Sequence, residues 1–322
     1  MKKITKKETR IKQRLLAVLL LTLPFAFYSC GGNASKNVTI TGAFALYPLG
    51  VKWAEQFKVL HPDLRFDVSA GGAGKGLTDV LAGAADVAMF SRLLTPEEEK
   101  KDIWVFAVAK DAVLPTFSLT NPLGGIIHRK GLTHDQLKEV YLSGKKDLSW
   151  GSLLDTTVTN PVVVYTRSDA AGAADTWAAY FDSKQENIKG TGIYGDPGLA
   201  EAVGKDQYSV GFNNVAYAYD ITTGKKRPGI DVIPIDRNNN RVIDANEDFY
   251  DNADSVLNAI SDGRYPSPPA RDLYFITKGK PTDPDVISFL KWVLTDGQKY
   301  VKAAGYVPLT PEKIKEQLAK LN

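Results

Sequence analysis

The most constraining feature of the sequence is a unit that occurs three times, in which a short apolar strand ends in small residues that lead directly into a helix. The three strands are predicted at residues 38–40, 65–68 and 162–164, and the small residues that follow them at 41–45, 70–74 and 167–173. Strands that alternate with helices indicate an α/β fold with a mostly parallel sheet. The three turns are therefore expected at the carboxyl ends of strands, where open sheets bind ligands.

Two lobes are expected, because the roughly 290 residues that follow the N-terminal segment exceed what one core accommodates. An apolar run at 104–119 is interpreted as two buried strands joined by a bend, one of which crosses to the second lobe. Lobe 1 is predicted to comprise residues 38–112 together with 232–322, and lobe 2 residues 113–231. Hinges are predicted near 111–115 and near Gly229.

The N-terminus is typical of a secretion signal at residues 1–29, because seven Lys and Arg side chains precede an apolar run at 15–27. The only cysteine, Cys30, follows directly, as expected of a bacterial lipoprotein whose cysteine is acylated. The alternative is an ordinary signal peptide with a leftover thiol, which is a liability in an oxidising compartment. We therefore expect an exported protein, periplasmic or at the cell surface, that residues 30–37 tether to the membrane.

Removal of residues 1–29 changes the charge balance, since this segment carries seven of the 40 Lys and Arg and only one of the 37 Asp and Glu. The remaining chain has 33 basic and 36 acidic side chains, a net charge near −3. It contains no cluster of Lys and Arg, so nucleic-acid binding is not expected.

The three small-residue turns are suited to an anion. At the start of a helix the first backbone N–H groups lack intrahelical partners and the helix dipole is positive, so the main chain itself binds negative charge. Small side chains let a ligand approach the backbone closely. For each turn alone, simple close packing of strand on helix is the alternative.

Four motifs resemble, in order, those of PstS-like phosphate-binding proteins of ABC importers, within the type II periplasmic-binding-protein superfamily. They lie at 41–49 with 52–54, at 69–76, at 85–92 and at 167–173. The resemblance implies a two-lobed α/β fold with mixed central sheets, helices on both faces and a two-strand hinge. It also implies a monomer without enzymatic activity that encloses a small anionic solute and delivers it to an importer permease.

The resemblance places ligand contacts in the same four motifs. In such proteins an arginine pairs with the ligand's charge and a carboxylate accepts a proton from phosphate, roles that fall on Arg167 and Asp169 here. Arg92 is a further candidate because a guanidinium matches oxyanions, with an ion pair on the lobe surface as the alternative. The predicted ligand-binding residues are Gly42, Ala43, Phe44, Gly72, Ala73, Ser91, Arg92, Arg167, Asp169, Ala171, Gly172 and Ala173.

The chain departs from the family where the ligand's hydroxyl donors are usually found, since family members usually place Ser or Thr at the positions of Ala43, Phe44, Ala73, Ala171 and Ala173. Each lost hydroxyl removes about 1.5–3 kcal/mol of hydrogen bonding to a charged acceptor. Either the amides and arginines still suffice for phosphate or a similar oxyanion, or the pocket suits a less charged solute. Persistence of Arg167 and Asp169 favours the oxyanion, although these two side chains alternatively satisfy only each other.

A second motif, at 236–247, has the spacing of an EF-hand-type Ca²⁺ loop. The predicted ligands are Asp236, Asn238, Asn240, Val242, Asp244 and Glu247. Arg241 stands where the sharp turn normally has Gly, and the preceding residues have the pattern of a strand rather than a helix. The alternative is a solvated Asn-rich turn. We expect a structural Ca²⁺ and no required cofactor.

Other function classes explain less of the sequence. The three histidines show no metal-ligand spacing, and a hydrolase built on Ser91 or Ser168 lacks a nearby histidine in sequence. A calcium-stiffened surface protein explains the 236–247 loop and the anchor but not the three turns. The sequence therefore favours a solute-binding protein over an enzyme.

Overall fold

The computed structural model describes residues 37–322, which form one compact unit. The predicted signal segment, the predicted acylation site at Cys30 and most of the predicted tether lie outside the described residues. The last tether residue, Asn37, already belongs to the first strand, β1 (Asn37–Gly42).

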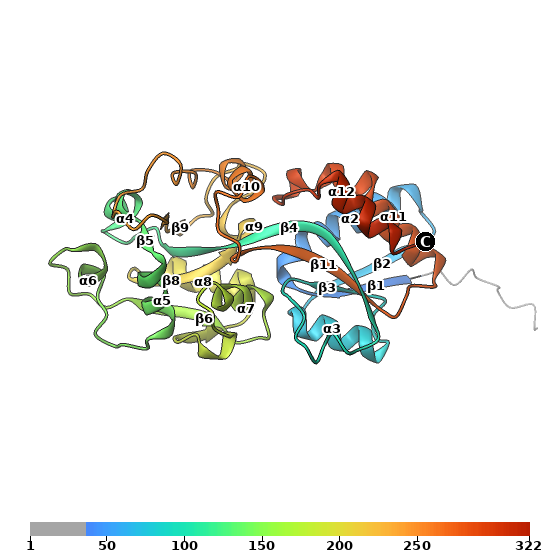
Figure 1. Ribbon diagram of the computed structural model, residues 1–322, viewed down its shortest axis with the longest axis horizontal. Coiled ribbons are helices and arrows are strands. Elements are labelled where there is room, and N and C mark those ends of the chain that lie inside the picture. Colours follow the sequence, from blue (N-terminus) through green and yellow to red (C-terminus); the bar gives the residue numbers. More distant parts are fainter. Residues whose placement is uncertain (1–36) are drawn as a thin grey trace, which may run out of the picture. The chain divides into compact units, whose positions relative to one another are not determined.

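The first half of the sheet contains three parallel strands, of which β1 and β2 correspond to the strands predicted at 38–40 and 65–68, and one antiparallel strand. β1 pairs with β2 (Arg65–Ala70) and β3 (Val87–Phe90), and β3 pairs with β11 (Ala270–Lys278) in the antiparallel sense. Figure 1 shows helices on both faces of these strands, with α3 on one side and α2, α11 and α12 on the other. Their bounds are α2 Tyr47–Leu60, α3 Ala73–Ala82, α11 Pro284–Leu294 and α12 Pro311–Ala319.

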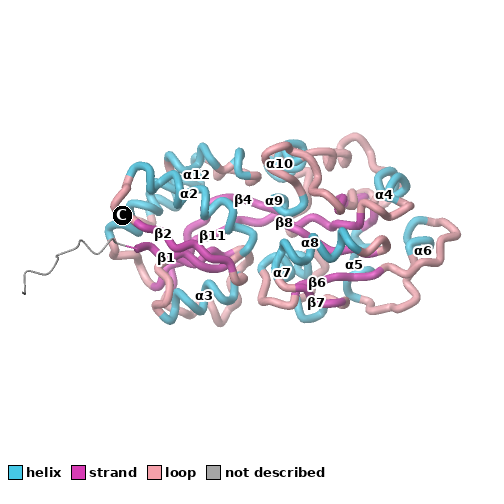
Figure 2. The backbone as a smooth tube through the Cα atoms, turned by 180° about the vertical axis from the view of Figure 1, so that it is seen from behind, coloured by secondary structure: helices cyan, strands magenta, loops and turns pink. Residues whose placement is uncertain are grey.

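The second half continues the same sheet with β8 (Ser209–Asn214), β6 (Val163–Arg167) and β7 (Thr191–Ile193). Two further strands, β5 (Leu132–Thr133) and β10 (Ile235–Asp236), form a separate pair, visible in Figure 1 beside α4. The accompanying elements, seen from behind in Figure 2, are α4 Gly124–Lys130, α5 His134–Leu142, α6 Trp150–Leu154, α7 Gly172–Ala179, α8 Gly195–Lys205, α9 Val215–Ala218, β9 Ile230–Val232 and α10 Ala253–Ser261.

The apolar run at 104–119 forms one strand, β4 (Ile103–Ser118), so the prediction of two strands joined by a bend is wrong. Its first part pairs with β11 and its second part with β8 and β9. The polar pair in its middle does not interrupt the strand, because Lys110 is partly exposed and the buried Asp111 has the guanidinium of Arg271 at 3.9 Å. The second strand that joins the halves is β11, not the segment near Gly229.

The hydrophobic side chains form two cores, one in each half of the sheet. The segment 232–270 packs in the second core, although the sequence predicts it in lobe 1. Its aromatic side chains explain the difference: Phe249, Tyr250 and Tyr265 pack on one another, and the Tyr265 hydroxyl donates to the carbonyl of Val113 at 2.6 Å. The chain changes from one core to the other within β11, between Ala270 and Leu273.

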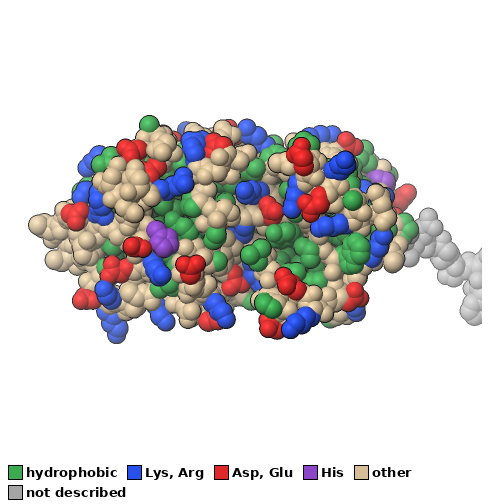
Figure 3. All heavy atoms as spheres, in the orientation of Figure 1, with side chains coloured by type: hydrophobic (Ala, Val, Ile, Leu, Met, Phe, Trp, Pro, Cys, Tyr) green, Lys and Arg blue, Asp and Glu red, His purple; other side chains and the backbone are tan. Residues whose placement is uncertain are grey.

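The face shown in Figure 3 carries Lys and Arg side chains intermixed with Asp and Glu. Between Asn37 and Asn322, no helix combines the length and the apolar character that crossing a membrane requires.

Candidate functional site

Each of the three turns starts a helix whose first amides no side chain caps. After β1, the 3₁₀ helix η2 (Phe44–Leu46) begins beyond Ala43, whose amide donates to the carbonyl of Met89 at 2.8 Å. α3 begins after Gly72, which has φ 96°, and α7 begins after Ala171. The cap positions, Ala43, Gly72 and Ala171, have no side-chain oxygen, so none of these cap side chains competes with a ligand for the first amides of the three helices.

The structure brings most of the predicted ligand-binding residues together around one narrow space. From the first half these are Ala43, Phe44, Gly72, Ala73 and Ser91, and from the second Arg167, Ala171, Gly172 and Ala173. Ala45, Asp196 and Asn214 complete the lining. We refer to this space as the inner site.

The two halves touch at the inner site. The amide of Gly74 donates to the carbonyl of Ala170 at 3.4 Å, and a Cβ atom on Gly72 would lie 3.0 Å from that same oxygen. The remaining space is too narrow for a water molecule. Small residues on both sides therefore permit the two halves to approach this closely.

Arg167 is the charged centre of the inner site. Its Nε and Nη2 donate to the two carboxylate oxygens of Asp169 at 2.8 and 2.6 Å, and its Nη1 donates to Asp196. The Phe44 ring lies 5.4 Å from the guanidinium carbon. Burial disfavours the charge on Arg167, but Asp196 and Asp169 outweigh this effect and raise its pKa. In this closed arrangement the protein itself satisfies Arg167, through Asp169 and Asp196 together rather than through Asp169 alone.

Sequence reasoning missed Asp196 and Asn214. The Nδ2 of Asn214 donates to Asp196 at 2.6 Å, so the two residues support the far side of Arg167. Asp196 follows β7 and Asn214 ends β8. Their position at the carboxyl ends of strands makes both candidates for a ligand site, because that edge of a sheet is where ligands bind, but it does not connect them to Arg167.

Two of the predicted residues have other roles in the structure. Gly42 has φ 135°, and its carbonyl accepts from the amides of Gly71 and Gly72, so it connects β1 to the start of α3. Arg92 donates to both oxygens of Glu98 at 2.7 Å and lies 2.9 Å from Asp175 on α7. Arg92 thus forms one ion pair within its own half, with Glu98, and a second one, with Asp175, that connects the two halves beside the inner site.

The 236–247 loop has the backbone turn that its motif requires. The buried Asp236 accepts from the amides of Asn240 at 3.3 Å and Arg241 at 2.8 Å, and Arg241 has φ 68°, the left-handed conformation for which Gly is normal. The guanidinium of Arg241 donates to the carbonyl of Leu153 at 2.6 Å and to Asp155 at 2.8 Å. These two contacts offset the cost of a non-glycine residue at this bend.

The loop's side chains are linked to one another. The amide nitrogens of Asn238 and Asn240 donate to Asp244 at 2.8 and 2.9 Å, and the buried Glu247 accepts from the amides of Arg237 and Asp244. Within residues 37–322, no group of three or more His, Cys, Asp or Glu side chains is arranged to hold a metal ion. Rotation of the two Asn amides would replace their donors by acceptor oxygens.

Comparisons with known proteins agree with the fold. Residues 30–297 match the model of the PBP superfamily domain, so the chain belongs to this family. The resemblance to PstS-like proteins is confirmed by relatives called phosphate-binding protein PstS. The one from Pseudomonas aeruginosa is 28% identical over 91% of this chain and 89% of its own length, and the one from Methanocaldococcus jannaschii is 25% identical over 97% and 95%.

Solved structures support the predicted two-lobed α/β fold. A Clostridium perfringens protein solved with bound phosphate has a TM-score of 0.68 at 19% identity and covers 85% of this chain and 100% of its own. An ABC-type phosphate transport receptor from Vibrio cholerae has a TM-score of 0.60 at 18% identity, with 84% and 100% covered. At these identities the likeness shows the fold alone.

Proposed function

We propose that the protein is the extracytoplasmic solute-binding component of an ABC importer and encloses phosphate or a similar small oxyanion at the inner site. The observation that carries this proposal is the convergence of turns from both halves, at Ala43, Gly72 and Gly172, on one space beside Arg167. Helix starts and a guanidinium are the groups that bind an oxyanion most directly. The relatives named for phosphate binding support the same solute.

The two halves open and close about β4 and β11, the strands that join them. In the open form the amides at Phe44, Ala73 and Gly172 are accessible, and Arg167 exchanges part of its pairing with Asp169 for the anion. Closure then excludes water, which strengthens each polar contact. Asp169 accepts the hydrogen of a protonated oxyanion, and the permease recognises the closed form.

The second hypothesis is a less charged solute in the same fold. The observation that favours it is the lining itself, because the alanines at 43, 73, 171 and 173 offer no hydroxyl and Arg167 already contacts two carboxylates. A ligand of this kind would pack on Phe44 and the alanines rather than on ionic donors.

A thermal-shift screen separates the two hypotheses. The panel comprises phosphate, sulfate and molybdate as compact oxyanions, with small neutral solutes of similar size. Because a ligand that binds only the folded state stabilises it by mass action, an oxyanion site predicts that the melting temperature rises with the oxyanions alone. A rise with the neutral solutes alone would favour the second hypothesis. No change with any compound would contradict a solute-binding role at the inner site.

We further propose that the protein is exported, that Cys30 carries its lipid anchor, and that it acts as a monomer without turnover of its solute. The Lys and Arg residues and the apolar run before Cys30 support export. The 236–247 loop is proposed to bind a structural Ca²⁺ through Asp236, Asn238, Asn240, Val242, Asp244 and Glu247. The left-handed turn at Arg241 supports this assignment.

A further inference from the structure

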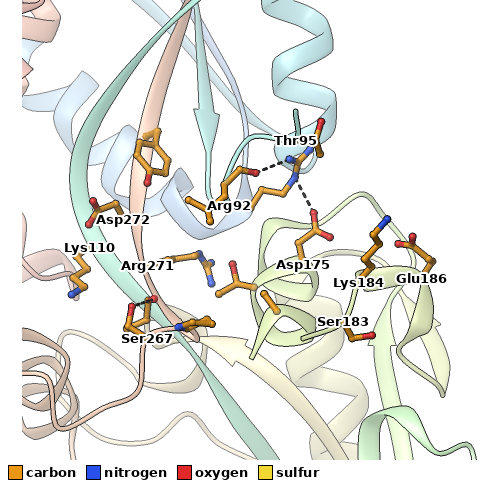
Figure 4. Close-up of a pocket in the computed structure, with 16 residues that line it drawn as sticks. Arg92, Thr95, Lys110, Asp175, Ser183, Lys184, Glu186, Ser267, Arg271 and Asp272 are labelled. Atoms are coloured by element: carbon orange, nitrogen blue, oxygen red, sulfur yellow. Dashed lines mark hydrogen bonds and ion pairs between the residues drawn. The ribbon is translucent and has the colours of Figure 1, made fainter. Parts of the chain in front are cut away.

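A larger cavity of about 680 Å³ lies beside the inner site and is lined by both halves of the molecule (Figure 4). We call it the outer chamber. β11 contributes Arg271 and Tyr274, the loop after β3 contributes Arg92 and Leu93, and α7 contributes Thr176 and Ala179. Cavities of about 300–1,000 Å³ with mixed apolar and polar walls are typical of sites for small organic molecules.

Arg271 is the unusual group of the outer chamber. Its side chain is only 8% exposed, yet within residues 37–322 neither its Nε nor its Nη1 has a hydrogen-bond partner. Figure 4 shows the guanidinium directed from β11 into the space between the halves. These two nitrogens are themselves buried, and a buried guanidinium with unsatisfied donors is costly. A negative charge placed against Arg271 in the chamber offsets part of that cost by charge attraction.

The surroundings hold Arg271 in place without satisfying it. Its Nη2 donates to the Oδ1 of Asn214 at 2.5 Å, and the same nitrogen lies 3.9 Å from Asp111. Asn214 also binds Asp196, the partner of Arg167. The two arginines therefore stand at opposite ends of one chain of contacts, Arg167 at the inner site and Arg271 at the outer chamber.

The other charges of the chamber leave room for one more negative group. Arg92 and Asp175 pair with each other, whereas Lys110 and Lys184 add positive charge and Asp272 and Glu186 negative charge at the partly exposed walls. The unsatisfied donors of Arg271 are the deepest charged groups, while Tyr274, Leu93 and Ala179 supply apolar surface. This arrangement fits a molecule with one anionic group and an apolar body.

We propose that the outer chamber is a binding site for an organic anion, whose carboxylate or phosphate group pairs with the guanidinium charge of Arg271 and whose apolar body packs against Tyr274 and Leu93. The outer chamber is distinct from the inner site. Its assignment rests on the proposed solute-binding role in one respect, namely that both sites lie between the two halves.

The test uses calorimetric titration of the protein with benzoate and phenyl phosphate as organic anions, benzyl alcohol as a neutral analogue, and inorganic phosphate as the ligand of the inner site. Ala179→Trp places a large ring in the chamber from an exposed position on α7 and leaves Arg271 itself in the chain. Ala82→Trp, at the exposed end of α3 and away from the chamber, is the matched control. Arg271→Gln removes the cationic group itself.

We expect at least one of the two organic anions to bind and benzyl alcohol not to bind. Ala179→Trp should lower the affinity for the anion at least ~10-fold, which corresponds to about 1.4 kcal/mol. Ala82→Trp should leave the affinity unchanged, and Arg271→Gln should abolish binding. The proposal is overturned if neither organic anion binds or if Ala179→Trp behaves like Ala82→Trp. Should Arg271→Gln fail to fold, the Ala179→Trp comparison still decides. Failure of inorganic phosphate to bind would instead count against the proposed function of the inner site.

Discussion

Gly172 lies against Ser91 so closely that a Cβ atom on Gly172 would be 2.2 Å from the Oγ of Ser91 and 2.6 Å from its carbonyl oxygen. The two residues belong to different halves of the molecule, since Ser91 follows β3 and Gly172 begins α7. The Oγ of Ser91 is buried and has no hydrogen-bond partner among the described residues. This contact therefore depends on the absence of a side chain at position 172.

Gly172→Ala is expected to keep the halves apart. Because the added methyl group meets Ser91 only when the halves close, the free energy of unfolding should change little while the affinity for phosphate falls ~10-fold or more. Phosphate titration together with small-angle scattering measures both effects. Gly125→Ala in α4 is the control, since its nearest neighbour would be the end of the Arg129 side chain at 3.6 Å. An unchanged affinity in Gly172→Ala would show that this contact does not form in the liganded protein.

Ala73→Ser and Ala173→Thr restore hydroxyl donors at the inner site. Both residues are buried at the start of a helix and line the space beside Arg167. Each new hydroxyl is expected to tighten phosphate binding by roughly 1.5 kcal/mol, about tenfold, if phosphate occupies this space. Ala82→Ser, on the exposed end of α3, should have no effect. Weaker phosphate binding in both variants would argue that the site is shaped for another solute.

Asp111 makes the stability of the protein depend on pH. Burial raises the pKa of Asp111 to about 7 from the ordinary value of 3.8. Between these values the folded state holds a proton that the unfolded state has lost, so this group's contribution to the free energy of unfolding falls as the pH rises from about 4 to 7, and is constant above.

Asp111→Asn removes this dependence. The free energy of unfolding is measured with denaturant at pH 5, 6, 7 and 8. Between pH 5 and 7 its value for the variant, relative to the natural protein, should rise by about 2 kcal/mol. Asp272→Asn, on the neighbouring strand β11 with a partly exposed side chain, is the control. If the free energies of unfolding of Asp111→Asn and the natural protein differ by the same amount at all four pH values, Asp111 does not hold a proton in the folded state over this range.

Calcium is expected to stabilise the protein through the 236–247 loop. Addition of ~1 mM Ca²⁺ should raise the melting temperature, since a metal that binds only the folded state stabilises it. Glu247→Gln should remove this rise, because it replaces the carboxylate that is expected to bind the ion through both oxygens. Asp251→Asn, at an exposed residue beyond the loop, should retain the rise. An equal melting temperature with Ca²⁺ and with a chelator would leave the loop as an Asn-rich turn.

The strand–turn–helix units were predictable because each is determined locally. The apolar residues before Gly42 and before Gly72 form β1 and β2. The apolar residues at helical spacing after Pro48 form α2, and the turn at Gly72 leads into α3. The small residues that the units share also indicated which loops would converge on one space. These features depend on neighbours in sequence, which is the information that one sequence contains.

The remaining features depend on contacts between distant segments. β4 continues through Lys110 and Asp111 because Arg271, 160 positions later, lies beside Asp111. The packing of 232–270 in the second core likewise depends on Tyr265 reaching Val113. Asp196 and Asn214 have no local pattern that connects them to Arg167, so only the assembled fold shows that they complete the inner site.

The most direct measurement is calorimetric titration of the protein with inorganic phosphate. Enclosure of an oxyanion at the inner site predicts a saturable heat with one phosphate bound per chain and a dissociation constant below ~1 mM, which corresponds to at least about 4 kcal/mol of binding free energy. If phosphate produces no saturable heat even at several times that concentration, the inner site does not bind this oxyanion.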